Sequence, residues 1–367
     1  MTTRTFRWGI LGAGRASRDF ARGLQALPDA TLIGVASRTA ATAQKFARSV
    51  PVQRIYGSYE DLVRDPAIDV VYVATPHHRH VADCSMALEH GKPILCEKPF
   101  AVSVREAQVV VDLARKKHLF CMEAMWMRFF PLIGKAQELT KSGAIGDPRM
   151  IMADFGVATA YDPRTRFYDP AQAGGALLDR GVYAISLAIM FFGAPEAICG
   201  QAGMSPSGVD EHSSVVLRFP KGRLALLSAS LSTYTSNEAT IMGTHGKLCL
   251  HAPFYCPQKL SISRYSPGVS SPEDAAPSLK QRLAARAKQS AVIRRAYMTL
   301  EPFIRRQTTS ITQPVVGNGY NYEAAEVMRC LRAGECESPV MPLDETLRIM
   351  QVMDEIRAQW GFKYPGE

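Results

Sequence analysis

The first 125 residues alternate short apolar runs with amphipathic helical stretches, and this rhythm restricts the fold more than any other feature of the sequence. The helical stretch near Ser103 begins with a capping-box pattern, Ser103-Val104-Arg105-Glu106. Alternation of this kind is typical of βαβ units. We therefore expect an α/β fold with an N-terminal parallel sheet. Its strands should be 6–11, 31–36, 70–74, 94–96 and 119–122.

The pattern changes after about residue 147 to β-branched and aromatic segments, such as 213–219 and 223–231, separated by Gly and Pro. Such segments predict an open, largely antiparallel sheet. A final amphipathic helix is expected from Leu343 to Trp360, and it could pack back onto the first half. Because 367 residues exceed what one core usually organises, we expect two domains, 1–125 and an α+β domain 126–367.

A glycine-rich turn, Gly12-Ala13-Gly14-Arg15-Ala16-Ser17, follows the first expected strand. In such a turn the first glycine permits the tight bend, and the second lets a pyrophosphate approach the backbone. The small third residue lets helix and strand pack. The helix N-terminus then offers its N–H groups to phosphates. The position of the turn favours a dinucleotide-binding Rossmann domain, with Gly12, Gly14, Arg15 and Ala16 at the cofactor.

The end of the second strand predicts which dinucleotide is bound. An acidic residue there would bind the ribose 2′-hydroxyl of NAD, but the strand ends in Val35-Ala36-Ser37-Arg38. Ser37 can donate to a 2′-phosphate, and Arg38 can pair with it or stack on adenine. We therefore favour NADP, with NAD as the second choice. Alternatively, Arg38 merely begins a solvated helix that Thr39 caps.

Several separated motifs resemble, in the same order, those of the glucose-fructose oxidoreductase and inositol dehydrogenase family. They are 9–15, 74–80, Glu97-Lys98-Pro99, 174–183 and 337–343, and they span nearly the whole chain. Within that family, the segment 123–131 is most similar to dimeric dihydrodiol dehydrogenases and NADP-dependent D-xylose dehydrogenases. The resemblance implies a hydride transfer between a nicotinamide and a CH–OH group of a sugar or cyclic diol. It also implies association through the open sheet face, so we expect a homo-oligomer, by analogy a dimer.

The resemblance implies a catalytic role for Lys98, Asp179 and Tyr183, with the Lys98-Pro99 bond cis. Asp179 and Tyr183, at i and i+4, would share one helix face. Tyr183 would be the general acid/base, and a neighbouring ammonium such as that of Lys98 would bring its hydroxyl nearer to working pH. Each residue also has a simpler interpretation: a surface lysine before proline, a helix cap and an edge of the core.

Other positions are expected near the cofactor or the substrate. The family places the segment with Thr75, His77, His80 and Glu97 near the cofactor. His77 and His80 lack a third ligand pattern, so we expect no metal there. The substrate pocket is expected to have aromatic and charged walls: Trp126, Arg128, Phe155 and Arg164.

Three other functions remain open for such a chain. They are a non-catalytic nucleotide-binding regulator, a sugar oxidoreductase with a tightly bound cofactor, and an NAD-dependent glycosidase that oxidises its substrate transiently. The intact Lys98, Asp179 and Tyr183 argue against a regulator, and the Tyr183 arrangement argues against a glycosidase.

A basic insertion at about 266–307 departs from this pattern. Between Leu279 and Arg306, eight Lys or Arg residues stand against one acid, so most of the net charge of +9 resides there. The segment could be a solvated insertion, a contact with an anionic membrane or protein surface, or a reach toward nucleic acid.

The eight cysteines form no Cys-x-x-Cys pair, and most lie in apolar runs. This pattern favours reduced thiols in the cytoplasm over a disulfide framework or a zinc site. No export signal is visible at the N-terminus. The longest uncharged stretch, Gly181 to Pro195, is too short to span a bilayer as a helix, so we expect no transmembrane segment.

Overall fold

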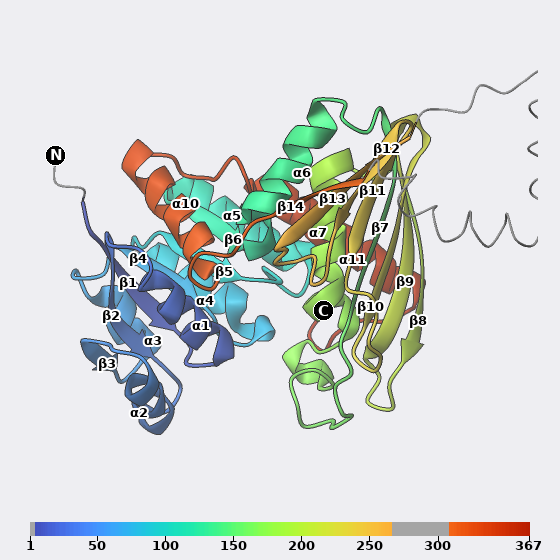
Figure 1. Ribbon diagram of the computed structural model, residues 1–367. Helices are drawn as coiled ribbons and strands as arrows, with labels where there is room; N and C mark the ends of the chain where they lie inside the picture. Colours follow the sequence, from blue (N-terminus) through green and yellow to red (C-terminus); the bar gives the residue numbers. More distant parts are fainter. Residues whose placement is uncertain (1–3, 266–307) are drawn as a thin grey trace, which may run out of the picture.

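The computed structural model describes residues 4–265 and 308–367, so the basic insertion lies outside the described residues. The chain forms two sheets that stand side by side, with helices between them (Figure 1). The first sheet has the order β3-β2-β1-β4-β5-β6, and all its pairings are parallel, which confirms the Rossmann fold. Its strands are β1 (Phe6–Leu11), β2 (Ala30–Ala36), β3 (Arg54–Tyr56), β4 (Val70–Val73), β5 (Ile94–Glu97) and β6 (Cys121–Ala124).

Helices cover this sheet, and one of them comes from the far end of the chain. The local ones are α1 (Arg15–Leu24), α2 (Ala40–Ser49), α3 (Tyr59–Arg64), α4 (His80–Glu89) and α5 (Val104–Lys117). Ser103 caps α5 as expected by accepting from the Glu106 N–H, but the Glu106 carboxylate accepts from the Val102 N–H at 3.1 Å, one residue before the N-cap. Helix α10 (Tyr320–Ala333) packs against α1, so the C-terminal part of the chain completes the first half (Figure 1).

The second sheet has the order β14-β13-β12-β11-β7-β10-β9-β8. Only the pairing of β7 with β10 is parallel, which confirms the largely antiparallel expectation. The strands are β7 (Pro148–Gly156), β8 (Ala197–Met204), β9 (Asp210–Phe219), β10 (Arg223–Ser230), β11 (Ala239–Gly243), β12 (Gly246–Leu250), β13 (Lys259–Arg264) and β14 (Thr308–Thr312).

One face of the second sheet is covered by helices α6 (Pro131–Lys141), α7 (Val182–Phe192) and α11 (Leu343–Gln359) (Figure 1). Helix α11 also packs against α5, where the Asp354 carboxylate accepts from the Val104 N–H at 2.8 Å. The last helix therefore does pack back onto the first half. No described helix covers the opposite face, on which Met152 and Val216 are exposed.

The helical stretch Pro170–Phe192 is long and apolar enough to cross a membrane, by length and composition alone. However, 83% of its most apolar window is buried inside the protein. Helix α7 forms its second half, and the residues from Val182 to Ile189 are all buried between the sheet and the neighbouring helices. The composition is therefore that of a core helix, in which every face contacts protein.

The turn after β1 offers a matched test of backbone conformation. Gly12 has φ +97°, and a Cβ there would lie 2.4 Å from the Ala74 carbonyl oxygen, whereas a Cβ on Gly14 meets no heavy atom within 4 Å. We expect Gly12→Ala to lower the free energy of unfolding by more than about 2 kcal/mol. Gly14→Ala should cost less than about 1 kcal/mol. Urea denaturation measures both, and equal losses would contradict this account of the turn.

Candidate active site

The turn after β1 leaves its backbone open to a ligand. Gly14 is the N-cap of α1, and no side chain caps this helix. The hydroxyls of Ser17 and Thr75 are buried and have no hydrogen-bond partner within the described part of the chain. Thr75 follows β4 at the carboxyl edge of the parallel sheet, where doubly wound folds bind their ligands. The uncapped N–H groups of α1 suit the phosphates of a dinucleotide.

The end of β2 carries the two residues expected to select the nucleotide. Ser37 is buried, whereas Arg38 is exposed. Thr39 caps α2 by accepting from the Thr42 N–H at 3.3 Å, as the simpler interpretation expected. This cap does not involve the Arg38 side chain. Arg38 has no ion-pair partner within the described residues, 4–265 and 308–367. Its guanidinium therefore remains available at the rim of the crevice.

Lys98 follows β5 and connects the two halves of the protein. The Lys98-Pro99 bond is cis. The ammonium donates to the Asp179 carbonyl oxygen at 2.6 Å and lies 3.4 Å from its carboxylate, which also accepts from Arg166 at 3.0 Å. Asp179 lies in a π-helical turn, Leu177–Gly181, that precedes α7. Burial opposes ionisation of Asp179, but Lys98 and Arg166 outweigh it and hold its pKa below the usual range.

Tyr183 lies one turn beyond, beneath the same ammonium. The Lys98 nitrogen is 4.8 Å from the centroid of its ring. The Tyr183 oxygen accepts a hydrogen bond from the Trp126 indole N–H at 2.9 Å. Because an indole nitrogen only donates, the proton of the Tyr183 hydroxyl stays free for another acceptor.

The expectation that Lys98 brings the Tyr183 hydroxyl nearer to working pH is wrong for this structure. Burial raises the pKa of Tyr183 well above its ordinary value, and the negative charge of Glu97 adds to the rise. The Trp126 hydrogen bond opposes this without cancelling it. Lys98 faces the ring rather than the oxygen, and its charge is shared with Asp179. Tyr183 is therefore a neutral phenol in this structure.

Aromatic side chains surround the Tyr183 ring. Phe155 on β7 meets it edge-on, with centroids 5.5 Å apart, and stacks on Tyr255 at 4.3 Å. Trp126 stacks on Tyr320 at 4.7 Å. Tyr255 and Tyr320 were not predicted from the sequence, because they follow β12 and begin α10 without any motif. Trp126 and Phe155, both expected to line a substrate pocket, thus contact Tyr183.

Arg128 is not part of such a wall. Its side chain is only 1% exposed and bridges α7 and α11. It donates to the Ser186 hydroxyl at 2.9 Å and to the Glu345 carboxylate at 2.5 Å. With its donors used inside the protein, Arg128 is a structural residue, and the expectation that it contacts substrate is wrong.

Arg164 points to solvent instead. Its side chain is 87% exposed, and its guanidinium pairs with both carboxylate oxygens of Asp162 at 2.9 Å. Arg166, two residues further on, is the arginine that reaches Asp179. The path of the loop decides which of the two arginines reaches Asp179, and no local sequence pattern predicts that path.

His77, His80 and Glu97, which were expected near the cofactor, make hydrogen bonds to other parts of the protein. His80 is fully buried, and its ring nitrogens lie 2.9 Å from the carbonyl oxygens of Pro99 and Thr75. Burial lowers the pKa of His80, so the ring is neutral and donates to one of them at a time. Glu97 accepts from the Tyr72 hydroxyl and, at 3.2 Å, from the Lys98 N–H. His80 and Glu97 thus brace the segment that carries Lys98. His77 lies 3.3 Å from the Ala173 carbonyl oxygen.

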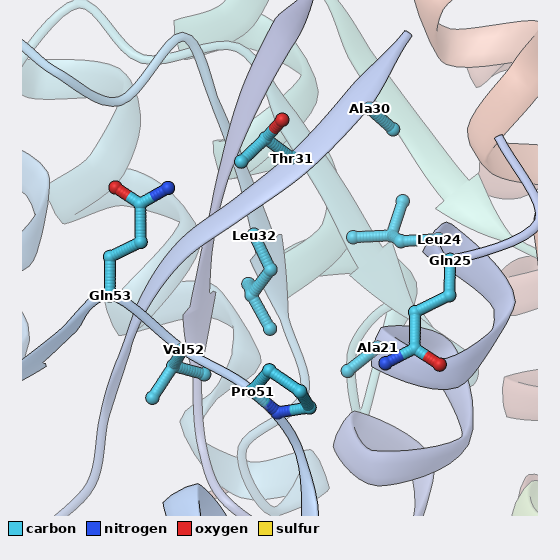
Figure 2. Close-up of a pocket in the computed structure, with 9 residues that line it drawn as sticks. All are labelled: Ala21, Leu24, Gln25, Ala30, Thr31, Leu32, Pro51, Val52 and Gln53. Atoms are coloured by element: carbon cyan, nitrogen blue, oxygen red, sulfur yellow. The ribbon is translucent and has the colours of Figure 1, made fainter. Parts of the chain in front are cut away.

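A cavity of about 340 Å³ lies elsewhere, between α1 and the first residues of β2 (Figure 2). Leu24, Leu32 and Pro51 line it, together with the amides of Gln25 and Gln53. It adjoins the amino end of β2, whereas the glycine turn lies at the carboxyl ends of the strands. Ligands of doubly wound sheets bind at the carboxyl ends. This cavity is therefore separate from the candidate active site.

Comparisons with known proteins agree with this architecture. Residues 6–125 match the family model described as "Oxidoreductase family, NAD-binding Rossmann fold", and residues 133–249 match "GFO/IDH/MocA C-terminal domain". Among curated proteins, the chain is 34% identical to trans-1,2-dihydrobenzene-1,2-diol dehydrogenase of Homo sapiens over 366 residues. It is 35% identical to the same-named protein of Danio rerio over 362 residues. Each alignment covers 98% of both chains.

Solved structures share the fold at lower identity. A levoglucosan dehydrogenase in complex with NADH and L-sorbose superimposes with a TM-score of 0.80 at 19% identity, covering 98% of this chain and 97% of that one. A 3-ketoreductase from Actinomadura kijaniata in complex with NADP and TDP-benzene has a TM-score of 0.77 at 22% identity, covering 97% and 98%. These likenesses show the two-sheet fold, and the curated relatives show the family. The chain belongs to the GFO/IDH/MocA family of oxidoreductases.

Proposed function

We propose that this protein is an NADP-dependent oxidoreductase that moves a hydride between the nicotinamide and a CH–OH carbon of a cyclic diol or sugar. The observation that carries the proposal is the neutral Tyr183 hydroxyl, held by Trp126 with its proton free and placed beside Lys98 and Asp179. Residues 1–125 would bind the dinucleotide, and the rest of the chain would bind substrate. The names of the curated relatives favour a diol over a sugar.

Each residue of the site has a separable role in this mechanism. When bound, the nicotinamide supplies or accepts the hydride. In the reducing direction, Tyr183 donates its proton to the carbonyl oxygen, and the Trp126 N–H stabilises the oxygen that is left behind. Lys98 orients and polarises the same carbonyl. Asp179 fixes the ammonium, and Arg166 holds the Asp179 carboxylate in place. In the oxidising direction the proton returns to Tyr183.

The cofactor preference rests on Ser37 and Arg38. A hydroxyl and an unpaired guanidinium at the end of β2 suit a 2′-phosphate, whereas NAD would leave both without a partner. Gly12, Gly14, Arg15 and Ala16 would hold the pyrophosphate. Thr75 would donate from its unpaired hydroxyl. His77, His80 and Glu97 would position the segments around the nicotinamide.

The substrate would lie against the aromatic surfaces of Trp126, Phe155 and Tyr255. Flat apolar faces of this kind suit a cyclic diol, which presents one apolar face and hydroxyls at its edge. An absorbance assay with NADP and NAD, against cyclic trans-diols and aldoses, tests the substrate class. Turnover on neither class would remove the proposed function.

A second copy of the chain would cover the apolar centre of the open face of the eight-stranded sheet, on β7, β10 and β9. Met152, Leu226 and Val216 are cross-strand neighbours there, and Met152 is 49% exposed. An apolar centre on an uncovered sheet is typical of an association surface.

The eight free thiols, four of them fully or almost fully buried, further support a reducing compartment such as the cytoplasm.

Sedimentation of Met152→Glu tests the homodimer. We expect the wild type to sediment as a dimer and the variant as a monomer, because the substitution places a carboxylate in the apolar centre of the interface. Arg164→Glu, on an exposed loop away from this face, is the control and should remain dimeric. A monomeric wild type would remove the proposal.

The neutral state of Tyr183 predicts a pH dependence. Oxidation needs a deprotonated Tyr183, and because its pKa lies well above about 10, the fraction of phenolate rises about tenfold per pH unit. We expect kcat/KM for oxidation to rise without a plateau between about pH 6 and 9, while reduction stays nearly flat. Tyr183→Phe should lower kcat by about 10²- to 10⁴-fold and leave NADPH binding unchanged. A plateau near neutral pH would contradict the assignment.

The two neighbouring arginines provide a matched pair. Arg166→Ala removes a partner of Asp179 and should lower kcat by about tenfold, because the Lys98 ammonium loses its fixed position. Arg164→Ala removes only an exposed ion pair and should leave kcat and stability unchanged. Steady-state kinetics measure kcat for both variants. An equal change in kcat in the two variants would show that Arg166 does not position Lys98.

A further inference from the structure

A second group of chemically reactive side chains lies on the open face of the eight-stranded sheet. Glu238 directly precedes β11, Cys249 lies on β12, and His251 follows β12. Side chains alternate along a strand, so Cys249 and His251 point to the same face. Thr240 pairs with Cys249, and the same register places Glu238 opposite His251.

The ligand atoms of these three residues converge. The His251 Nδ1 lies 2.8 Å from a Glu238 carboxylate oxygen and 3.9 Å from the Cys249 sulfur. The sulfur lies 3.8 Å from the other carboxylate oxygen. Zinc binds sulfur at about 2.3 Å and nitrogen or oxygen at about 2.0–2.2 Å, so tetrahedral ligands lie about 3.4–3.6 Å apart. The two spacings to sulfur, 3.9 and 3.8 Å, are slightly longer than this range. The Nδ1–carboxylate spacing of 2.8 Å is shorter, so the Glu238 carboxylate would rotate away from the ring to make room for the cation.

An outer layer of hydrogen bonds already orients the histidine. The His251 Nε2 lies 2.7 Å from the Ser261 hydroxyl oxygen on β13, which lies 3.1 Å from that of Ser310 on β14. If Nε2–H donates to Ser261, the lone pair of Nδ1 faces Glu238 and Cys249. Metal-bound histidines usually donate their second N–H in this way, which fixes the tautomer.

The same ring could instead act as the base of a Ser261–His251–Glu238 hydrolase triad. Two observations argue against this. Ser261 is buried, and β13 at this position pairs with β12 on one side and β14 on the other. The backbone N–H groups that could form an oxyanion hole are therefore already hydrogen-bonded within the sheet. A triad also leaves the nearby Cys249 thiol without a role.

We propose that Glu238, Cys249 and His251 bind a zinc-class divalent cation through one carboxylate oxygen, the thiolate sulfur and Nδ1. Binding releases the thiol proton to solvent. The side chains of His251 and Glu238 are 31% and 39% exposed, so a water molecule can complete a tetrahedral set. The cation would join β11 to β12 and stabilise the sheet. The proposal does not depend on the dehydrogenase chemistry, because no residue is shared with the Tyr183 site.

Titration of the chelator-treated full-length protein with Co²⁺ tests the site. We expect one equivalent to bind and to produce the near-ultraviolet charge-transfer band of a cobalt–thiolate bond. Cys249→Ser should abolish this band. Glu238→Gln and His251→Ala should weaken Co²⁺ binding by at least about tenfold. Zn²⁺ should raise the Tm of the wild type and leave that of Cys249→Ser unchanged.

Cys199→Ser is the matched control. Cys199 is an exposed cysteine on β8 of the same sheet, five strands from β12, and its loss should leave the cobalt band intact. Circular dichroism checks that each variant is folded. Absence of the band in the wild type, or its persistence in Cys199→Ser and Cys249→Ser alike, would overturn the proposal.

Discussion

The contact between Lys98 and Asp179 is the interaction on which the rest of the site depends. Lys98 leaves the carboxyl end of the parallel sheet, and Asp179 lies in the turn that leads into the core helix of the second half. Both side chains are nearly buried, with 13% and 11% of their surfaces exposed. An unpaired charge at such a depth would be strongly unfavourable, so each half needs the other to keep its charge there. The pair therefore fixes where the two halves meet.

The surroundings of this pair set the chemistry of Tyr183. The Lys98 ammonium contacts the Asp179 carbonyl and carboxylate and also lies over the ring of Tyr183. Little of its positive charge therefore acts on the phenol oxygen. Burial then dominates, and Tyr183 stays protonated. Trp126 donates to the phenol oxygen, so the phenol hydrogen remains free to be donated to another acceptor. Under the proposed function, a protonated Tyr183 suits reduction at neutral pH, and oxidation becomes faster at higher pH.

The sequence predicted the parts of the fold that depend on local pattern. The βαβ rhythm and the glycine turn are local, and the strands β1 and β2 were placed within a residue of their bounds. The short edge strand β3 was missed, because three residues with two exposed side chains carry no alternating apolar signal. The antiparallel sheet was expected, but its eight-strand order depends on pairings between distant segments.

The candidate site was predicted only in part, for the same reason. Lys98, Asp179 and Tyr183 belong to motifs, and the structure brings them together. Arg128 was assigned wrongly because its partners, Ser186 and Glu345, lie 58 and 217 residues away in the sequence. The Tyr183 pKa was expected to fall because proximity to an ammonium can be inferred from motifs, whereas burial requires the packed structure.

Kinetic isotope effects on diol oxidation test the central claim most directly. The account predicts that deuterium on the carbon bearing the hydroxyl slows the wild type, and that D₂O slows it further, because hydride and the Tyr183 proton move in the same step. In Tyr183→Phe the solvent effect should vanish while the carbon effect persists or grows. A solvent effect of equal size in both proteins would show that another group carries the proton, and would contradict the account.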